Sequence, residues 1–399
     1  MGTICVNRKL MRLLFIADFS EQFPYRILKG IRKYSQESGD PWVVCRMPPS
    51  YVQKTGFKGL VSWARKWQAD IVLAPFNPGD KVEEFRAHGI AAIAIDNVAP
   101  FSQIPNLTAD YHAMGEMVAA RFVTIGLRNF GFFGYNDICW SDGRRQGFRD
   151  YLESQGLADH YYVGDRIRTD ALWSYDEAKL AEWILSLPTP IGIMACDDTQ
   201  ANILLEGCRT AGKNVPAEIA VVGVDNDEVL CSMTDPPLSS VDVDMESGGY
   251  ALARMAERMV REPDYPGEDI VLRPIGIVRR MSSSMMATSD KSVQAAINFI
   301  NHNLDKKIKV ADVLRQVPMS RRSLEQHFQK ATGMSVYDYI SRLRVEYLAQ
   351  QLLEGTEPVS AIAARMDEPD AKSISRRFLA VKGCTPTQYR RQHLRKLGV

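Results

Sequence analysis

The sequence predicts a two-lobed α/β domain with parallel sheets, followed by an all-α domain that holds two helix-turn-helix units. Two patterns predict this order. Short apolar runs alternate with amphipathic stretches over about the first 280 residues, whereas the last 110 residues show helical patterns joined by turns. The chain has 399 residues, of which 45% are hydrophobic, so it can bury more than one core. We expect a first domain at 1–284, a linker at 285–290 and a second domain at 291–399.

The apolar runs of the first domain are continuous rather than alternating. Continuous runs of about five residues are typical of strands buried on both faces, and therefore of parallel sheets covered by helices. The runs lie at 13–18, 42–45, 70–76, 91–96, 129–134, 191–195 and 220–224. A helical stretch near 110–126 separates them into two lobes, about 10–105 and 110–245, and the chain returns near 269–274 to the first.

Acidic or amide side chains follow several of these runs. In open α/β sheets the carboxyl ends of the strands face the ligand, so two facing lobes would bring these polar groups to one cleft. The residues in question are Asp18, Asp96, Asn136, Asp197, Asp198, Asp225 and Asn226.

Each helix-turn-helix unit of the second domain ends in a helix with one apolar stripe. The first unit covers 310–328 with a turn at Pro318, and the second covers 359–378 with a polar turn. Leu324 with Phe328, and Ile374 with Phe378, are i,i+4 pairs that bury one side of each second helix and turn the other side outward. Ser320 and Asp370 are the predicted N-caps of these helices.

The outward stripes hold side chains that can reach base edges and phosphates of double-stranded DNA. The simpler alternative is that these stripes are solvated charged faces. Arg321 and Arg377 could contact phosphates only. The predicted DNA contacts are Arg321, Arg322, Glu325 and Gln326 in the first unit, and Lys372, Ser375 and Arg376 in the second.

The net charge of +1 is the sum of two parts of the chain that carry opposite net charges. Residues 291–399 contain 19 Lys and Arg against 10 Asp and Glu, whereas the first 290 residues contain 30 against 38. A basic module attracts the phosphate backbone, with an affinity that falls steeply as salt rises. An acidic module does not compete with it for DNA.

The second domain resembles the DNA-binding domain of AraC/XylS-type regulators over about residues 291–392. The match lies in the run at 320–328, in Gly333-Met-Ser, in Tyr339-Ile with Arg344, and in Gly383-Cys-Thr-Pro with Tyr389-Arg390. The chain departs from the family in two places: Asp367-Glu368 replaces the usual Gly-Phe, and Ile374 replaces an aromatic residue. Two acids at that turn are expected to repel phosphate. The resemblance implies an activator that works with RNA polymerase.

The first domain resembles the sugar-binding core of LacI/GalR regulators and periplasmic binding proteins over about residues 10–280. The best match is 217–228 followed by 236–241, which implies a ligand-binding acid at Asp225. The segments 196–201 and 144–148 imply ligand contacts at Asp197 and Arg144, and Asp96 and Trp173 fall near other binding positions. No helix-turn-helix precedes the first strand, which is a departure from LacI/GalR proteins.

A sugar needs carboxylates that accept from its hydroxyls, a cation that donates, and an aromatic plane for its apolar face. Asp225, Asp197, Arg144 and Trp173 would supply these groups. Three alternatives remain. Asp198 would cap the following helix rather than contact a ligand, Arg144 could pair with Asp142 or Asp150, and Trp173 could belong to the core.

Other function classes are disfavoured. The sequence lacks the phosphate-loop, dinucleotide-binding and nucleophile-elbow motifs, and its six histidines show no metal spacing, so we expect neither a catalytic site nor a cofactor or metal. The alternative is an acid cluster of Asp18, Asp197 and Asp225 that binds Mg²⁺ for phosphoryl transfer, or accepts a phosphoryl group as response regulators do. Seven scattered cysteines, no secretory segment and no apolar run near 18 residues predict a cytoplasmic protein that does not enter membranes.

Together these observations predict a sugar-responsive transcription factor in which sugar binding changes the placement of the two recognition helices. The combined layout is similar to that of xylose-responsive regulators, and that resemblance alone implies D-xylose as the effector. It also implies a homodimer on an operator of double-stranded DNA.

Overall fold

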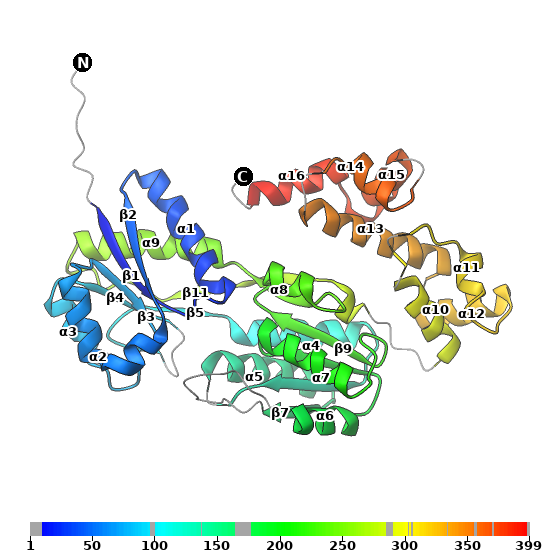
Figure 1. The fold of residues 1–399 in the computed structure, drawn as a ribbon, viewed down its shortest axis with the longest axis horizontal. Coiled ribbons are helices and arrows are strands. Elements are labelled where there is room, and N and C mark those ends of the chain that lie inside the picture. The colour runs from blue at the N-terminus through cyan, green and yellow to red at the C-terminus, as the bar shows by residue number, and fades with distance from the viewer. Residues whose placement is uncertain are drawn as a thin grey trace, which may run out of the picture. The chain divides into compact units, whose positions relative to one another are not determined.

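The computed structural model describes residues 10–95, 100–136, 138–163, 177–284, 290–301, 303–304, 306–332, 334–354, 357–368 and 371–396. The contacts within the chain divide it into two units, Met1–Ser283 and Ser284–Val399. The first unit is the α/β part and the second is helical, which confirms the predicted fold class (Figure 1). Of the predicted linker 285–290, only Asp290 is among the described residues.

The first lobe of the first unit is built on a sheet in which every neighbouring pair of strands is parallel. Its strands, in spatial order, are β11 (Ile270–Leu272), β5 (Asn106–Ala109), β4 (Ala91–Ile95), β3 (Ile71–Ala74), β1 (Met11–Ile16) and β2 (Trp42–Met47). Its helices are α1 (Gln22–Ser38), α2 (Pro49–Lys66), α3 (Glu83–Ala87) and α9 (Met245–Arg261). Strands β3 and β4 are buried along their whole length, as continuous apolar runs require.

The second lobe repeats this plan with one antiparallel edge. Its strands, in spatial order, are β12 (Pro274–Val278), β10 (Ser239–Val243), β9 (Ile219–Val224), β8 (Ile191–Ala195), β6 (Asn129–Gly134) and β7 (Asp159–Val163), with β12 antiparallel to β10. Its helices are α4 (Tyr111–Thr124), α5 (Cys139–Ser154), α6 (Glu177–Ser186), α7 (Asp198–Thr210) and α8 (Glu228–Met233), and a short 3-10 helix, η1 (Met281–Ser283), follows β12.

Each of the seven predicted apolar runs overlaps a strand. The sequence did not predict β5, β7, β10 and β12 as strands. Two of them, β7 and β12, lie at sheet edges, and none of their described residues is buried.

The chain passes between the two lobes three times, after β5, after β10 and between β11 and β12. The three crossings are hydrogen-bonded to one another, because the backbone N–H of Asp110 donates to Leu272 O (2.8 Å) and that of Asp244 donates to Arg273 O (3.0 Å). The carboxylates of Asp110 and Asp244 also cap the helices that follow, α4 and α9. The first two crossings therefore lead directly into a helix of the lobe that the chain enters, and the third leads into β12.

Each lobe contains a pair of helices whose backbones touch through glycines. In the first lobe, α1 and α9 lie side by side (Figure 1), and a Cβ placed on Gly30 would lie 2.0 Å from the carbonyl oxygen of Glu246. In the second lobe, a Cβ on Gly115 of α4 would lie equally close to the carbonyl oxygen of Arg144 in α5. Only a residue without a side chain permits such contact, so these positions hold α4 and α9 rigidly to their lobes.

The second unit consists of two groups of helices connected by one long helix. The helices are α10 (Lys291–Asn301), α11 (Val310–Leu314), α12 (Arg321–Thr332), the long α13 (Val336–Glu354), α14 (Val359–Arg365), α15 (Ala371–Lys382) and α16 (Pro386–Lys396). Leu324 and Phe328 of α12, and Ile374 and Phe378 of α15, are buried, which confirms the predicted apolar stripes. The predicted cap Ser320 accepts a hydrogen bond from Ser323 N at 3.2 Å, whereas Asp370 lies outside the described residues.

Replacing Gly30 with alanine should lower the free energy of unfolding by about 1–3 kcal/mol, because the added methyl group forces α1 away from α9. Gly276→Ala in β12 is the matched control, since no atom lies within 4 Å of its new Cβ. Denaturant unfolding of the full chain measures both variants. Equal stabilities would show that the two helices can separate without cost.

Candidate functional site

The predicted ligand-binding acid Asp225 lies in a strained turn at the carboxyl end of β9. Asp225 and Asn226 have φ values of 99° and 50°, a left-handed conformation that side-chain-bearing residues rarely adopt. Backbone bonds hold the turn, since Asp225 N donates to Val241 O (3.0 Å) and Asn226 N donates to Ser240 Oγ (3.0 Å). Arg280 donates to the side-chain oxygen of Asn226 at 2.9 Å. Strain maintained by several bonds is typical of ligand sites.

Arg144 of α5 forms an ion pair with Asp225. Its guanidinium donates to Asp225 Oδ1 at 3.2 Å and to the carbonyl oxygen of Cys196, and its side chain is only 6% exposed. Burial lowers the pKa of Arg144, but Asp225 and other neighbours more than offset this and keep the group charged. The alternative pairing with Asp142 or Asp150 is not the one observed.

Aromatic rings surround the Arg144 guanidinium. Its centre lies 5.6 Å from the ring of Tyr111 and 5.3 Å from that of Trp140, within the range of cation–π attraction. The rings and the ion pair together fix the guanidinium beside Asp225.

Asp197 and Asp198 follow β8 and have different roles. Asp197 caps α7 by accepting a hydrogen bond from Gln200 N at 2.6 Å, so the prediction that Asp198 is the cap was wrong. Asp198 is buried at the first helical position, where its Oδ2 accepts from Asp227 N at 2.8 Å. Burial raises its pKa well above the usual range. Asp198 therefore supports the Asp225–Asp227 segment and does not face solvent.

Asp197 as a whole residue is partly exposed, but the protein atoms around its carboxyl group displace water from it. Burial raises its pKa to about 6, and the charge of Asp225 adds to the shift, while the hydrogen bond from Gln200 N and the charge of Arg144 oppose it. Asp197, Arg144 and Asp225 thus form one electrostatic group in the second lobe.

Arg26 of α1 extends this group to the first lobe. It donates to the carbonyl oxygens of Asp225 (3.1 Å) and Val243 (2.9 Å), and it pairs with the carboxylate of Asp242 at 2.9 Å. No sequence motif marks these bonds, because Arg26 and its partners lie 199 to 217 positions apart in the chain.

Two residues of the first lobe, Asp18 and Arg46, have contacts that the sequence did not predict. Asp18 accepts from Ser20 within its own turn. The guanidinium of Arg46 lies 5.5 Å from the ring of Phe19 and 6.0 Å from that of Tyr25. The predicted ligand contacts Asp96 and Trp173 lie outside the described residues.

The first recognition helix, α12, exposes three of its four predicted DNA contacts. Arg321, Arg322 and Gln326 are exposed. Glu325 is half-buried, and its carboxylate accepts from Val336 N at 3.1 Å, so it caps α13. Sequence spacing alone did not reveal this second role of Glu325.

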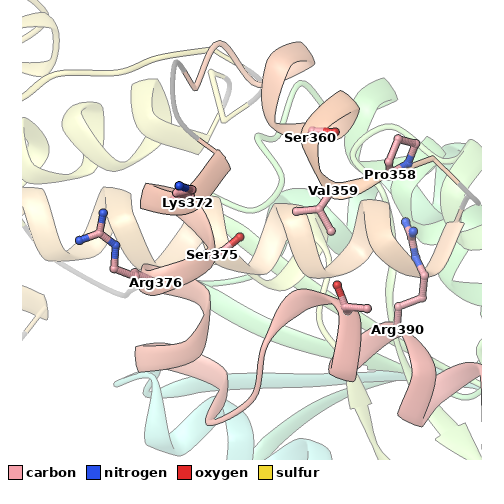
Figure 2. Close-up of a pocket in the computed structure, with 8 residues that line it drawn as sticks. Pro358, Val359, Ser360, Lys372, Ser375, Arg376 and Arg390 are labelled. Atoms are coloured by element: carbon pink, nitrogen blue, oxygen red, sulfur yellow. The ribbon is translucent and has the colours of Figure 1, made fainter.

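The second recognition helix, α15, exposes Lys372 and Arg376 and leaves Ser375 half-buried. These three residues line a concave surface together with the first residues of α14 and with Arg390 of α16 (Figure 2). The predicted contacts of this helix therefore share one surface with the basic side chain of Arg390, and its positive charge suits a phosphate backbone.

The acidic turn before α15 does not present two free carboxylates. Asp367 takes a left-handed conformation, with φ of 53°, at the position where the family has glycine. Glu368 is almost buried and pairs with Arg344 (3.1 Å) and Arg377 (2.7 Å). The expectation that both acids repel phosphate was wrong for Glu368, because two arginines neutralise it.

Two family models match the chain. A model described as a periplasmic binding protein-like domain matches residues 119–283, and a helix-turn-helix domain model matches residues 313–392. The chain combines a periplasmic binding protein-like domain with an AraC-type helix-turn-helix domain. It is a DNA-binding transcription regulator and not an enzyme.

Proteins with both parts of this regulator are known. The xylose operon regulatory protein of Escherichia coli K12 is 22% identical over 96% of this chain and 97% of its own length. Its Haemophilus influenzae counterpart is 27% identical over 88% and 90%. A solved structure of the xylose-binding transcription activator XylR shares the fold with a TM-score of 0.70, at 22% identity over 96% of this chain and 98% of that one.

Within the described residues of this regulator, no group of three or more His, Cys, Asp or Glu side chains is arranged to hold a metal ion. The same residues include no helix with the length and apolar character needed to cross a membrane.

Asp197→Asn should make the stability of the regulator less dependent on pH. Because the pKa of Asp197 is raised on folding, the folded state binds more protons between about pH 4 and 6, and its stability falls as pH rises through that window. Asparagine still caps α7 but carries no charge. At each pH, the midpoint temperature of wild type is subtracted from that of the variant. We expect this difference to be about 2 °C larger at pH 7.5 than at pH 4.5.

Thermal unfolding at both pH values measures this difference. Asp244→Asn, which replaces a cap whose hydrogen bond from Ser247 N is exposed, is the control. If the difference in midpoint temperature between Asp197→Asn and wild type did not change with pH, the pKa of Asp197 would not be raised in the folded protein.

Proposed function

We propose that this regulator binds a simple sugar, with D-xylose the first candidate, and that binding changes the placement of its two recognition helices on an operator. The observation that carries the proposal is the Arg144–Asp225 pair beside Asp197 at the carboxyl ends of β8 and β9. Ligands of open α/β sheets bind at this end of the strands. The names of the relatives support xylose as the sugar to test first.

The chemistry of this group suits a polyhydroxylated ring. The Asp225 side chain is 28% exposed while Arg144 is nearly buried. Arg144 therefore fixes the Asp225 carboxylate and leaves part of it accessible, where it can accept a hydrogen bond from a ligand hydroxyl. Asp197, with its pKa of about 6, adds a second acceptor. A sugar epimer would leave one of these groups without a partner, which is costly in a site closed to water.

The hydrogen bonds of Arg26 offer a route from ligand to lobe movement. Arg26 binds the backbone of Asp225 from the first lobe, so a ligand that shifts Asp225 also changes how the lobes are connected. A ligand can shift this equilibrium only by its difference in affinity for the two arrangements. Sugar would favour the arrangement in which the DNA-binding domain can engage its operator.

On DNA, each chain would place α12 and α15 in successive major grooves, about 34 Å apart. A homodimer would then present four recognition helices to an extended or repeated operator in the cytoplasm. The AraC-type DNA-binding domain favours activation, through contact with RNA polymerase, over repression.

A thermal-shift screen with D-xylose, L-arabinose, D-ribose, D-glucose and D-galactose tests the sugar proposal. One sugar should raise the midpoint temperature by several degrees, since a ligand at about 100 times its Kd stabilises the folded state by about 2.7 kcal/mol. Asp225→Asn should abolish this rise, because it removes the charge that the ligand hydroxyls and Arg144 share. Asp264→Asn, in an exposed turn after α9, should retain it. No shift with any sugar would reject a simple-sugar effector and leave the DNA-binding function standing.

Arg322→Ala should relax DNA sequence preference by about 1–3 kcal/mol at one base position, since an arginine on the exposed side of α12 can bind a base edge with two bonds. Fluorescence anisotropy with duplexes enriched by the wild-type protein, and with single-base variants of them, measures the preference. Lys330→Ala, near the other end of the helix, is the control. An equal loss on all duplexes would mean that Arg322 contacts only phosphate.

A further inference from the structure

A set of ionic bonds, in which two of the three side chains are nearly buried and the third is 27% exposed, links the two halves of the DNA-binding domain. It consists of Arg344 on the long helix α13, Glu368 in the turn before α15, and Arg377 on α15 itself. Glu368 stands where related domains have an apolar residue, so the sequence departs from the family pattern at the centre of this set.

Arg344 joins three segments of the domain. Its guanidinium donates to the carbonyl oxygen of Lys306, just before α11, and to that of Met366 (2.6 Å), just after α14. It also pairs with Glu368 Oε1 at 3.1 Å, and its side chain is 4% exposed. One side chain therefore connects the segment that leads into the first unit, the long helix α13 and the turn of the second unit.

Glu368 extends this connection to the second recognition helix. Its other carboxylate oxygen pairs with Arg377 at 2.7 Å, and its own side chain is 9% exposed. Its backbone N–H donates to Ala363 O at 2.9 Å, so the residue is fixed at both ends. Replacing one partner of such a pair leaves a buried charge without compensation, so the arrangement is strongly preferred over alternatives.

The ion pair between Glu357 and Arg365 in the same domain is exposed, unlike the pairs of Glu368. Glu357 and Arg365 lie 2.8 Å apart, but both side chains are 52% exposed, and exposed pairs of this type constrain structure weakly. Burial and the bonds to three separate segments distinguish the Glu368 set from an ordinary surface pair.

We propose that Glu368 holds α12 and α15 at one spacing and one angle, so that the protein binds only DNA whose two half-sites are a fixed number of base pairs apart. This inference rests on the proposed binding of both helices to DNA. Glu368 is a positioning residue, since its carboxylate is occupied by two arginines. One inserted base pair rotates the second half-site by about 34° and moves it by about 3.4 Å along the axis. A rigid pair of helices cannot follow that change.

The experiment uses the full chain and duplexes enriched from a random library by the wild-type protein. The contact regions of α12 and α15 are located on one enriched duplex by footprinting, and versions with one and two base pairs inserted between them are prepared. Wild type should lose at least about tenfold in affinity with one insertion, because one recognition helix loses its base contacts. Glu368→Gln should bind the original duplex more weakly and lose less than about threefold on insertion, since the turn can then move.

Two further variants keep the test decisive if Glu368→Gln unfolds the domain. Arg377→Gln leaves the Arg344–Glu368 pair in place and should also reduce the penalty for insertion; a mere loss of a phosphate contact would instead weaken all duplexes equally and flatten the salt dependence. Glu357→Gln, which breaks the exposed pair, should keep the wild-type penalty. An unchanged penalty in both Glu368→Gln and Arg377→Gln would overturn the inference. Failure of wild type to enrich any duplex would instead reject the proposed binding of both helices to a specific operator.

Discussion

The proposed ligand site of this regulator depends on the ion pair between Arg144 and Asp225. A buried guanidinium must find acceptors, and Arg144 finds them at Cys196 O and Asp225, which follow two neighbouring strands. The pair therefore sets the positions of both strand ends and of the raised-pKa carboxyl of Asp197. Arg26 binds the backbone of the same aspartate from the other lobe. A ligand that competes for Asp225 would act on every one of these contacts at once.

The DNA-binding domain contains the same kind of interaction, a buried arginine paired with an acidic side chain. Arg344 is also a buried guanidinium that binds backbone carbonyls at the ends of helices and one carboxylate, that of Glu368. Such pairs add little net stability compared with apolar packing, because both charges lose their water. Their effect is geometric, since a guanidinium has five donors in a fixed plane and accepts few arrangements of its partners. In both domains, the position of functional surfaces is set by an arginine that binds carbonyl oxygens and a carboxylate of its own chain.

The sequence predicted the fold well because its signals are local. Continuous apolar runs gave all seven expected strands, and the i,i+4 pairs ending at Phe328 and Phe378 gave the buried sides of both recognition helices. Long-range bonds had no such signal. Nothing near Arg26 or Glu368 in the sequence indicates partners on other elements, and the capping role moved from Asp198 to Asp197 by the shift of one residue in the start of α7. The resemblance to known families identified Arg144 and Asp225, but only the structure showed that they bind each other.

The bonds of Glu325 and Arg377 have a consequence for attempts to reprogram this regulator. Both residues lie on recognition helices, yet Glu325 caps α13 and Arg377 is bound to Glu368. A helix transplanted from another regulator would bring new residues to these two positions and detach the helix from its scaffold, whatever bases the graft was chosen to recognise. Swapping should be confined to the predicted DNA contacts that are exposed, which are Arg321, Arg322 and Gln326 on α12 and Lys372 and Arg376 on α15. The number of operators reachable by helix exchange is therefore smaller than the length of the two helices suggests.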